Sequence, residues 1–338
     1  MYDIITFGSA TQDIHVKSKA FKILKGEKDF ATGEGLCLAL GSKIDVEDII
    51  YTTGGGGTNT AATFARQGLK TAYCGAIGVD LPGLEVIRDL KHFGVDTRFL
   101  AKKKEKKTNS SIVIADDGED RTILVYRGAS DLYSEKDIKW NKIKKARWFY
   151  LAPLSGMLLA EFEEIVNFAK QNNIKVACNP SKQQLSLPKE KLKRVFSKID
   201  ILFLNQEEAS FLTETDFKDE SEIFKKIDEM CHGIAVMTKG AEGVVVSDGE
   251  YLYSAVPNPD REIVDTTGAG DSFASGFLSG YIRFNKEIVK AIQLGLANSE
   301  ANLADLGAKT GILSKKSDFR RVEVTKQLCT ENNLCLPK

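Results

Sequence analysis

The chain is poor in the residues that build disulfide frameworks and metal clusters. Its 338 residues include six cysteines and three histidines, and no two cysteines have the Cys-x-x-Cys spacing of zinc sites and redox motifs. We therefore expect no zinc centre and no disulfide framework, with most thiols packed as small apolar groups. Free thiols are also expected at Cys329 and Cys335 near the C-terminus, although pairing of these two is left open.

An excess of charge of either sign is also missing. Forty-seven basic residues balance forty-seven acidic ones, so no global field favours nucleic acid or an anionic membrane. The N-terminus, Met1 to Phe7, has neither the basic segment nor the cleavage site of a secretory signal, and no apolar run is long enough to span a bilayer. These absences predict a cytoplasmic protein that acts on small molecules, without nucleic-acid or membrane partners.

What is present is a regular alternation of short apolar segments with amphipathic ones. The predicted strands are 4–7, 71–74, 148–151, 175–178, 201–204 and 233–237, and the predicted helices are 61–66, 82–93, 157–171, 220–230 and 287–302. This order predicts an α/β fold in which helices cover both faces of a mostly parallel sheet. The segments 14–51 and 97–127 break the alternation and predict a small β-sheet, with a turn at 116–119, that projects over a pocket.

The most specific feature is a carboxylate directly behind a glycine-rich turn. Residues 265–273 read Asp-Thr-Thr-Gly-Ala-Gly-Asp-Ser-Phe and lead into an apolar helix. Small residues at 268–270 leave the backbone N–H groups of a helix start open to an anion. Asp271 beside such a site is suited to take a proton from an attacking hydroxyl group. Taken alone, the same residue is equally well explained as a helix-capping carboxylate.

A second glycine-rich turn indicates a binding site for a polar ligand. Gly54 to Gly57 precede Thr58 and Asn59, and the helix is expected to follow from Thr60. Four glycines let a ligand lie against bare backbone, and the Asn59 amide offers both a donor and an acceptor. The turn lacks the Lys-Ser/Thr pair of a P-loop and the spacing of a dinucleotide fingerprint. An NAD-dependent oxidoreductase, the second enzyme class that the alternation allows, therefore has little support.

Three more polar turns follow predicted strands. Asp13 is suited to bind two sugar hydroxyls, although capping of a local loop is the simpler explanation. Asn205 and Glu208 have the spacing of a helix capping box, and Glu208 is alternatively suited to hold Mg²⁺ through water. The turn 238–243 offers backbone amides and a Thr hydroxyl for nucleotide phosphates, but a plain hairpin needs the same glycines.

In their order along the chain, these segments resemble the ribokinase-like (PfkB) family of carbohydrate and nucleoside kinases. The resemblance covers nearly the whole chain, 1–338, as one domain. It rests on six matching segments, which are Asp13, 54–59, 75–83, 205–208, 238–243 and 265–273. It implies a three-layer α/β/α core with a β lid, and transfer of the γ-phosphoryl group of ATP to a hydroxyl group of a small sugar with Mg²⁺. It also implies a homodimer formed through the lid.

Position by position, the resemblance assigns a role to each motif. The catalytic base and the anion hole fall on Asp271, Gly268, Ala269 and Gly270. The acceptor site falls on Asp13, Gly55, Gly56 and Asn59. The ATP site falls on Asn205, Thr238, Gly240 and Gly243. The cation sites fall on Glu208 for Mg²⁺ through water, and on Asp265 and Thr267 for an activating K⁺.

Three departures from the family pattern concern the substrate and the cation. Ribokinase has an Asn and a Glu in the sugar site where this chain has Thr11 and Ala152, so ribose specificity is not supported. The segment between Asp13 and Gly54 is longer than in ribokinase, and its length is closer to that of the lids of nucleoside kinases. A nucleoside acceptor therefore stays open. The segment 302–311 departs from the small-residue pattern of the K⁺ site. A catalytically silent nucleotide-binding protein is a third alternative, against which the intact Asp271 argues.

Overall fold

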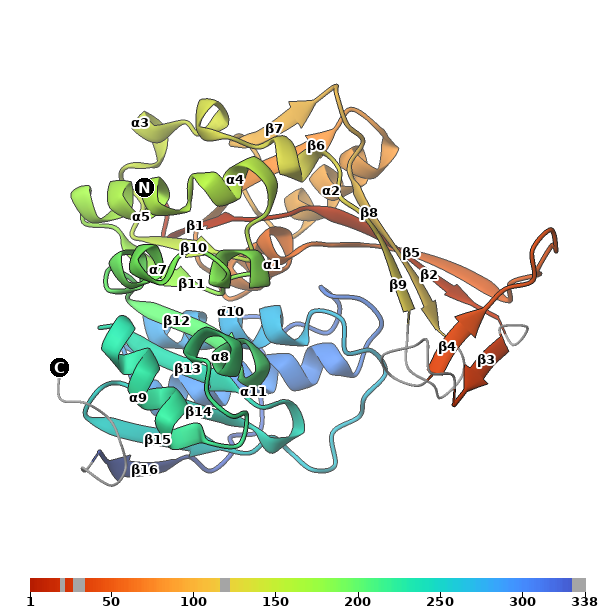
Figure 1. Ribbon diagram of the computed structural model, residues 1–338. Coiled ribbons are helices and arrows are strands. Elements are labelled where there is room, and N and C mark those ends of the chain that lie inside the picture. Colours follow the sequence, from red (N-terminus) through yellow and green to blue (C-terminus); the bar gives the residue numbers. More distant parts are fainter. Residues whose placement is uncertain (19–21, 27–33, 116–121, 330–338) are drawn as a thin grey trace.

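The computed structural model describes residues 1–18, 22–26, 34–115 and 122–329, and its core is one large sheet (Figure 1). Within these residues the sheet has ten strands in the order β16-β15-β14-β13-β12-β11-β10-β1-β6-β7. Pairing is parallel from β7 to β13 and antiparallel from β13 to β16. The strands are β1 Ile4–Phe7, β6 Thr71–Gly78, β7 Leu100–Lys103, β10 Trp148–Leu151, β11 Lys175–Cys178, β12 Ile201–Asn205, β13 Ile234–Thr238, β14 Val244–Ser247, β15 Tyr251–Ala255 and β16 Thr325–Leu328.

Helices cover both faces of this sheet and complete three layers. One face carries α1 Gly56–Arg66, α2 Leu81–His92, α10 Ala269–Arg283 and α11 Ile288–Leu303. The other carries α4 Gly156–Ala160, α5 Phe162–Gln171, α7 Lys189–Phe196, α8 Gln206–Thr213 and α9 Glu220–Met230. Shorter helices are α3 Trp140–Ile143, α6 Lys182–Leu185 and the 3-10 turns η1 Ala129–Leu132, η2 Glu135–Asp137 and η3 Gly240–Glu242. The predicted α/β class is confirmed.

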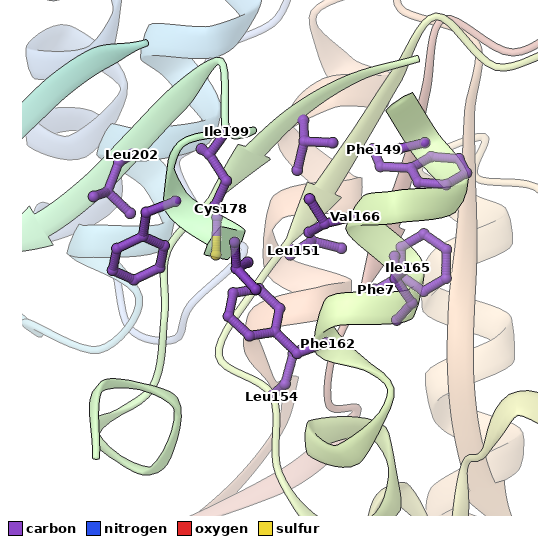
Figure 2. Close-up of a cluster of buried hydrophobic side chains, with 14 of the residues drawn as sticks. Phe7, Phe149, Leu151, Leu154, Phe162, Ile165, Val166, Cys178, Ile199 and Leu202 are labelled. Carbon is purple, nitrogen blue, oxygen red and sulfur yellow. The ribbon is translucent and has the colours of Figure 1, made fainter. Parts of the chain in front are cut away.

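The apolar strands are buried on both faces, which explains their nearly continuous hydrophobic sequences. In β1 the side chains alternate, since Ile5 and Phe7 pack on the side of α5 whereas Ile4 packs on the side of α10. Figure 2 shows the first of these clusters, where Phe7 and Phe149 from the strands meet Ile165 and Val166 of α5. Because both faces are sealed, the polar residues at the carboxyl ends of the strands are left at one edge of the sheet.

A second sheet projects from this core (Figure 1). It consists of β2 Thr11–Lys17, β5 Asp48–Gly54, β8 Asn109–Ala115 and β9 Thr122–Tyr126 in the order β5-β2-β8-β9. A separate antiparallel pair, β3 Lys22–Lys25 and β4 Glu34–Cys37, lies between β2 and β5 in the sequence. The predicted small sheet, called the lid sheet below, is thus present. The predicted turn at 116–119 lies outside the described residues.

Three details of the sequence prediction are wrong. Residues 100–103 were expected in the lid but pair with β6 in the core sheet, because their parallel partner is the extended end of that strand. Asp13 lies inside β2 rather than in a loop. The helix expected from Thr60 begins at Gly56, so Asn59 stands in its first turn. The last difference arises because a ligand-binding glycine turn and a helix start can share residues.

Cysteines and apolar helices bear on two further expectations. Cys37, Cys74, Cys178 and Cys231 are free, as expected. Cys329 is disulfide-bonded, which corrects the expectation of a free thiol, and Cys335 lies outside the described residues. In the part of the chain that the structure describes, no helix has both the length and the apolar character needed to cross a membrane. The cytoplasmic location stays a prediction.

Candidate active site

The turn before α10 presents open backbone at a helix N-terminus. Gly268 caps the helix in the left-handed region, with φ 82°, and a Cβ atom there would lie 2.6 Å from the Cβ of Ala308. Glycine is therefore required at this position. A Cβ at Gly270 would meet nothing within 4 Å. The predicted anion hole is accordingly an open N-terminal turn in which the helix dipole favours negative charge.

Asp271 stands in the first turn of α10, directly beside this open backbone. Burial of its carboxyl group raises its pKa, and a hydrogen bond of 2.8 Å from Asn59 Nδ2 to Asp271 Oδ2 acts in the opposite direction. Part of the side chain still reaches solvent. The other amide atom, Asn59 Oδ1, is buried and finds no hydrogen-bond donor in the described part of the chain. Asp271 and Asn59 thus place a candidate base next to an amide oxygen that can still accept a hydrogen bond.

The Gly55–Gly56 turn joins Asp271 to the lid sheet. Gly55 has φ 95°, and a Cβ there would lie 2.6 Å from the Ser9 carbonyl oxygen. A Cβ at Gly56 would lie 3.4 Å from Asp271 Oδ1 and 3.1 Å from Pro153 Cδ. The turn therefore packs too closely for side chains, and it borders the carboxylate that we predict to be catalytic.

Asp13 lies beyond the same turn, on β2. A Cβ at Gly54 would overlap the Asp13 carboxylate, so these two residues are in direct contact. Asp13 is 7% exposed. Burial raises the pKa of its carboxyl group, while a hydrogen bond from Ser111 and electrostatic interactions with His15 and Lys309 oppose the rise. Asp13, Gly55, Gly56 and Asn59, called the acceptor surface below, thus lie at or next to one glycine turn, and their role in binding the acceptor stays a prediction.

A cavity of about 310 Å³ opens on the other side of the anion turn. Thr238, Gly240 and Gly243 line it together with Ala269 and Gly270. Its walls include apolar side chains from α10 and α11, among them Phe273 and Leu296. The residues predicted for ATP and for the transferred phosphoryl group therefore meet in one cavity, although Asn205 is not part of its lining.

Asn205 and Glu208 form the predicted capping box at the start of α8. Asn205 Oδ1 accepts from the Glu208 backbone N–H at 2.8 Å, and Glu208 Oε2 accepts from the Asn205 N–H at 2.9 Å. These bonds are a sufficient structural reason for both residues. Burial raises the pKa of the Glu208 carboxyl group. Among the described residues, no three His, Cys, Asp or Glu side chains gather as a metal site. A single carboxylate with water ligands is nevertheless how proteins often hold Mg²⁺.

Asp265 ties the anion turn to the loop after α11. Its Oδ1 accepts from Thr267 N at 2.9 Å and from Thr267 Oγ1 at 2.7 Å, and its Oδ2 accepts from Gly307 N at 3.0 Å. Asn302, near the end of α11, donates through Nδ2 to the carbonyls of Gly307 and Thr310 in this loop. The two residues predicted for K⁺ therefore have an evident structural role as a clamp.

Sequence reasoning missed one buried charge near the acceptor turn, the ammonium of Lys309. It lies 2.7 Å from Asp89 Oδ2, 2.6 Å from Thr53 Oγ1 and 3.4 Å from Thr58 Oγ1. Burial lowers its pKa, whereas the nearby Asp89 and Asp13 carboxylates oppose that change. Nothing in the local pattern marks this lysine, because its partners come from α2, β5 and α1.

Comparison with known proteins identifies the family. The model of the pfkB family of carbohydrate kinases matches residues 31–315, and the chain belongs to this family. It is therefore a kinase with an alcohol group as acceptor. It is 29% identical over 279 residues to a ribokinase of Haemophilus influenzae, covering 80% of this chain and 87% of the relative. It is also 29% identical over 231 residues to a nucleoside kinase of Methanothermobacter thermautotrophicus, covering 68% and 72%.

Solved structures agree on the fold. A ribokinase of Arabidopsis thaliana complexed with ribose and ATP aligns with a TM-score of 0.77 at 20% identity, covering 93% of this chain and 96% of the other. An adenosine kinase from Sinorhizobium meliloti aligns with a TM-score of 0.74 at 23% identity, covering 93% and 97%. The predicted ribokinase-like architecture, a three-layer core with a small sheet, is confirmed. The relatives act on different acceptors and leave the substrate of this chain unresolved.

Proposed function

We propose that this kinase transfers the γ-phosphoryl group of ATP to a hydroxyl group of a small sugar, with Asp271 as the general base. The observation that carries the proposal is the position of this carboxylate. It stands beside the open backbone of Gly270, it is held by Asn59, and it borders the Gly56 turn of the acceptor surface. Its raised pKa makes it a stronger base than an exposed aspartate.

The proposed reaction is a single displacement at the γ-phosphorus. Asp271 accepts the proton of the acceptor hydroxyl, whose oxygen forms a bond to the γ-phosphorus while the bond to the β-γ bridging oxygen breaks. The phosphorylated sugar and ADP leave, and Asp271 releases its proton to solvent. Backbone N–H groups of Gly268, Ala269 and Gly270 stabilise negative charge on the phosphoryl oxygens. Asn59 keeps the base oriented and offers Oδ1 to a hydroxyl of the acceptor.

The donor site has support from the cavity that Thr238, Gly240 and Gly243 line. We propose that these residues bind ATP, and that Asn205 acts on the phosphates from the end of the neighbouring strand. Bound Mg²⁺ would offset charge on the donor phosphates, and Glu208 is the residue that we propose to hold it through water. We also propose that Asp265 and Thr267 help to bind an activating K⁺.

The acceptor site has support from the surface formed by Asp13, Gly55, Gly56 and Asn59, where hydroxyl groups of a sugar meet carboxylate and amide partners. A nucleoside is the second candidate acceptor. The observation that favours it is the relative named a nucleoside kinase, at the same 29% identity as the relative named a ribokinase.

We also propose a homodimer formed through the lid sheet. Every residue of its outer strand β9 is exposed, and Leu124 and Val125 are 53% and 60% exposed. An open apolar edge strand favours pairing with another chain. Sedimentation velocity is expected to show a dimer for the native protein and a monomer for Leu124→Lys. A native monomer contradicts the proposal.

An ADP-release assay with Mg²⁺ tests the proposed function. The acceptors are pentoses, hexoses, sugar acids, sugar phosphates and nucleosides, each with and without K⁺. Asp271→Asn should reduce the rate with the preferred acceptor by about 10²–10⁴-fold while ATP binding, followed by fluorescence, is kept. Asp318→Asn, on the exposed surface, is the matched control. A loss of only a few-fold in Asp271→Asn excludes this residue as the base.

A further inference from the structure

A cavity of about 280 Å³ lies between the lid sheet and the core sheet. Its lining holds two cationic side chains, no acidic one, and many hydroxyl and amide groups. The lining includes Ser9, Ser111, Arg127, Pro153, Ser155 and Lys182. The composition differs from that of the cavity at the ATP residues, which includes Glu300, and from that of the cavity behind β5, which includes Glu85 and Asp89.

This cavity adjoins the acceptor surface. Ser111 stands opposite Asp13 in the pairing of β2 with β8 and donates a hydrogen bond to its carboxylate. Pro153 is the neighbour of Gly56, whose Cβ position is 3.4 Å from Asp271 Oδ1. A ligand in the cavity therefore has one end near the proposed base. The cavity shares no lining residue with the one at Gly270, which holds the residues proposed for ATP.

The two cations at this cavity are Arg127, directly after β9, and Lys182, the first residue of α6. Neither forms an ion pair within the described residues, and the Lys182 ammonium lies 5.6 Å from the centre of the Phe211 ring. The neighbouring carboxylate of Asp131 is already engaged, since it accepts from Ser155 Oγ at 2.9 Å and lies 3.9 Å from the Lys106 ammonium. Both cations are exposed at the border of the cavity, and no carboxylate of the described residues pairs with either of them.

A neutral sugar in this cavity would offer the two exposed cations no counter-charge. A carboxylate or phosphate offers that charge, and the planar guanidinium of an arginine binds either group with two parallel hydrogen bonds. We propose that the acceptor carries a negatively charged group, a carboxylate or a phosphate, and that Arg127 and Lys182 bind it at the far end of the cavity from Asp271. This inference rests on the proposed kinase function and names the class of its substrate.

The test compares neutral acceptors with their anionic counterparts in the ADP-release assay. Suitable sets are glucose, gluconate and glucose 6-phosphate, then fructose and fructose 6-phosphate, then cytidine and cytidine monophosphate. We expect kcat/KM to be about 100-fold higher or more for an anionic member than for its neutral parent. Sugar acids, sugar phosphates and nucleotides all carry an anionic group of the kind that we propose the cavity binds. Comparing the three sets shows which of these three classes the enzyme uses.

Variants of the two cations locate the effect. Arg127→Gln and Lys182→Gln should each raise KM for the anionic acceptor about 10–100-fold with kcat nearly unchanged, and should leave KM for neutral acceptors as it was. Lys182→Arg should retain the native KM. The charge-matched controls are Arg321→Gln and Lys193→Gln, both at exposed positions outside the cavity.

The outcomes separate this inference from the function on which it rests. The anionic acceptor is excluded if a neutral acceptor has the same kcat/KM as its anionic counterpart, or if both glutamine variants keep the native KM. The kinase assignment stands in either case. If no acceptor of any class releases ADP, the proposed sugar kinase activity and the inference fail together.

Discussion

Asn59 and Asp271, 212 positions apart in the chain, are joined by a hydrogen bond of 2.8 Å from the amide to the carboxylate. The bond connects the first turn of α1 to the first turn of α10, so the acceptor turn and the anion turn are held together by the proposed base itself. Burial favours the protonated form of Asp271, and the bond from Asn59 favours the ionised form. The pKa of the base is therefore set by two opposing contacts.

The first prediction concerns the pH dependence of the rate. A base acts in its ionised form, so kcat/KM should be full above the raised pKa of Asp271 and should fall as the pH drops through it. Asn59→Leu removes the bond that lowers this pKa, so the acidic limb of the profile should move to higher pH. Profiles from about pH 5 to pH 9 measure the shift. Asn141→Leu, at an exposed position, should leave the limb unchanged, and an unshifted limb in Asn59→Leu contradicts the coupling.

The second prediction is that Asp271→Asn stabilises the protein while it reduces the rate by about 10²–10⁴-fold. Because burial raises the folded-state pKa above its unfolded value, the native chain binds this proton more tightly, and the contribution to stability is lost as the pH rises through the folded-state pKa. An asparagine carries no charge and still pairs with Asn59. Thermal unfolding at pH 7 should show a Tm about 2 °C higher in the variant, as expected for roughly 1 kcal/mol in a chain of this size. The gain should vanish towards acidic pH, and a lower Tm contradicts the argument.

The sequence was sufficient for features that are fixed by local pattern. The apolar strands, the capping box at Asn205 and the helix start at Gly268 each depend on neighbours within a few residues, and each appears in the structure. The proximity of Asn59 to Asp271 was also expected, although only through the family resemblance. No local pattern joins these two residues, because parallel strands bring their polar ends together regardless of separation in the chain.

Other features depend on partners that are distant in sequence, and these were missed or misplaced. Lysine is a polar residue and is expected at the surface, but Lys309 is buried. Its ammonium can be buried because Asp89 and Thr53, from two separate elements, bind it. Asp13 was placed in a loop because the short gap after Phe7 hides the change from the core sheet to the lid sheet. Arg127 and Lys182 stand 55 positions apart in number, and only the fold brings them to one cavity.

The third prediction separates the two explanations of Glu208. Asn205→Ala removes the helix cap and should destabilise the protein by about 1 kcal/mol. Glu208→Gln keeps a side-chain acceptor for the Asn205 N–H but removes the charge, so the stability should change little. If Glu208 holds Mg²⁺, the Mg²⁺ concentration for half-maximal rate should rise about 10-fold or more in Glu208→Gln. Glu207→Gln, one residue earlier and exposed, is the control. An unchanged Mg²⁺ dependence leaves Glu208 with the structural role alone.

The fourth prediction concerns the buried ammonium of Lys309 and its carboxylate partner Asp89. Lys309→Met leaves that carboxylate without its counter-charge, and removing one partner of a fully buried pair costs about 3–5 kcal/mol. The Asp89 side chain is 29% exposed, so we expect roughly 2 kcal/mol, measured by urea unfolding. The double variant Lys309→Met with Asp89→Asn should recover much of this loss, because no unpaired charge remains.

An exposed ion pair supplies the control for this cycle. Lys189 and Glu214 are 2.6 Å apart, with side chains 60% and 68% exposed. Lys189→Met should therefore change the stability much less than Lys309→Met does. Lys309 also contacts Thr58 in the acceptor turn, so Lys309→Met should raise KM for the acceptor more than KM for ATP. Equal losses of stability in the two methionine variants, with both KM values unchanged, show that Lys309 neither holds the fold nor positions the acceptor turn.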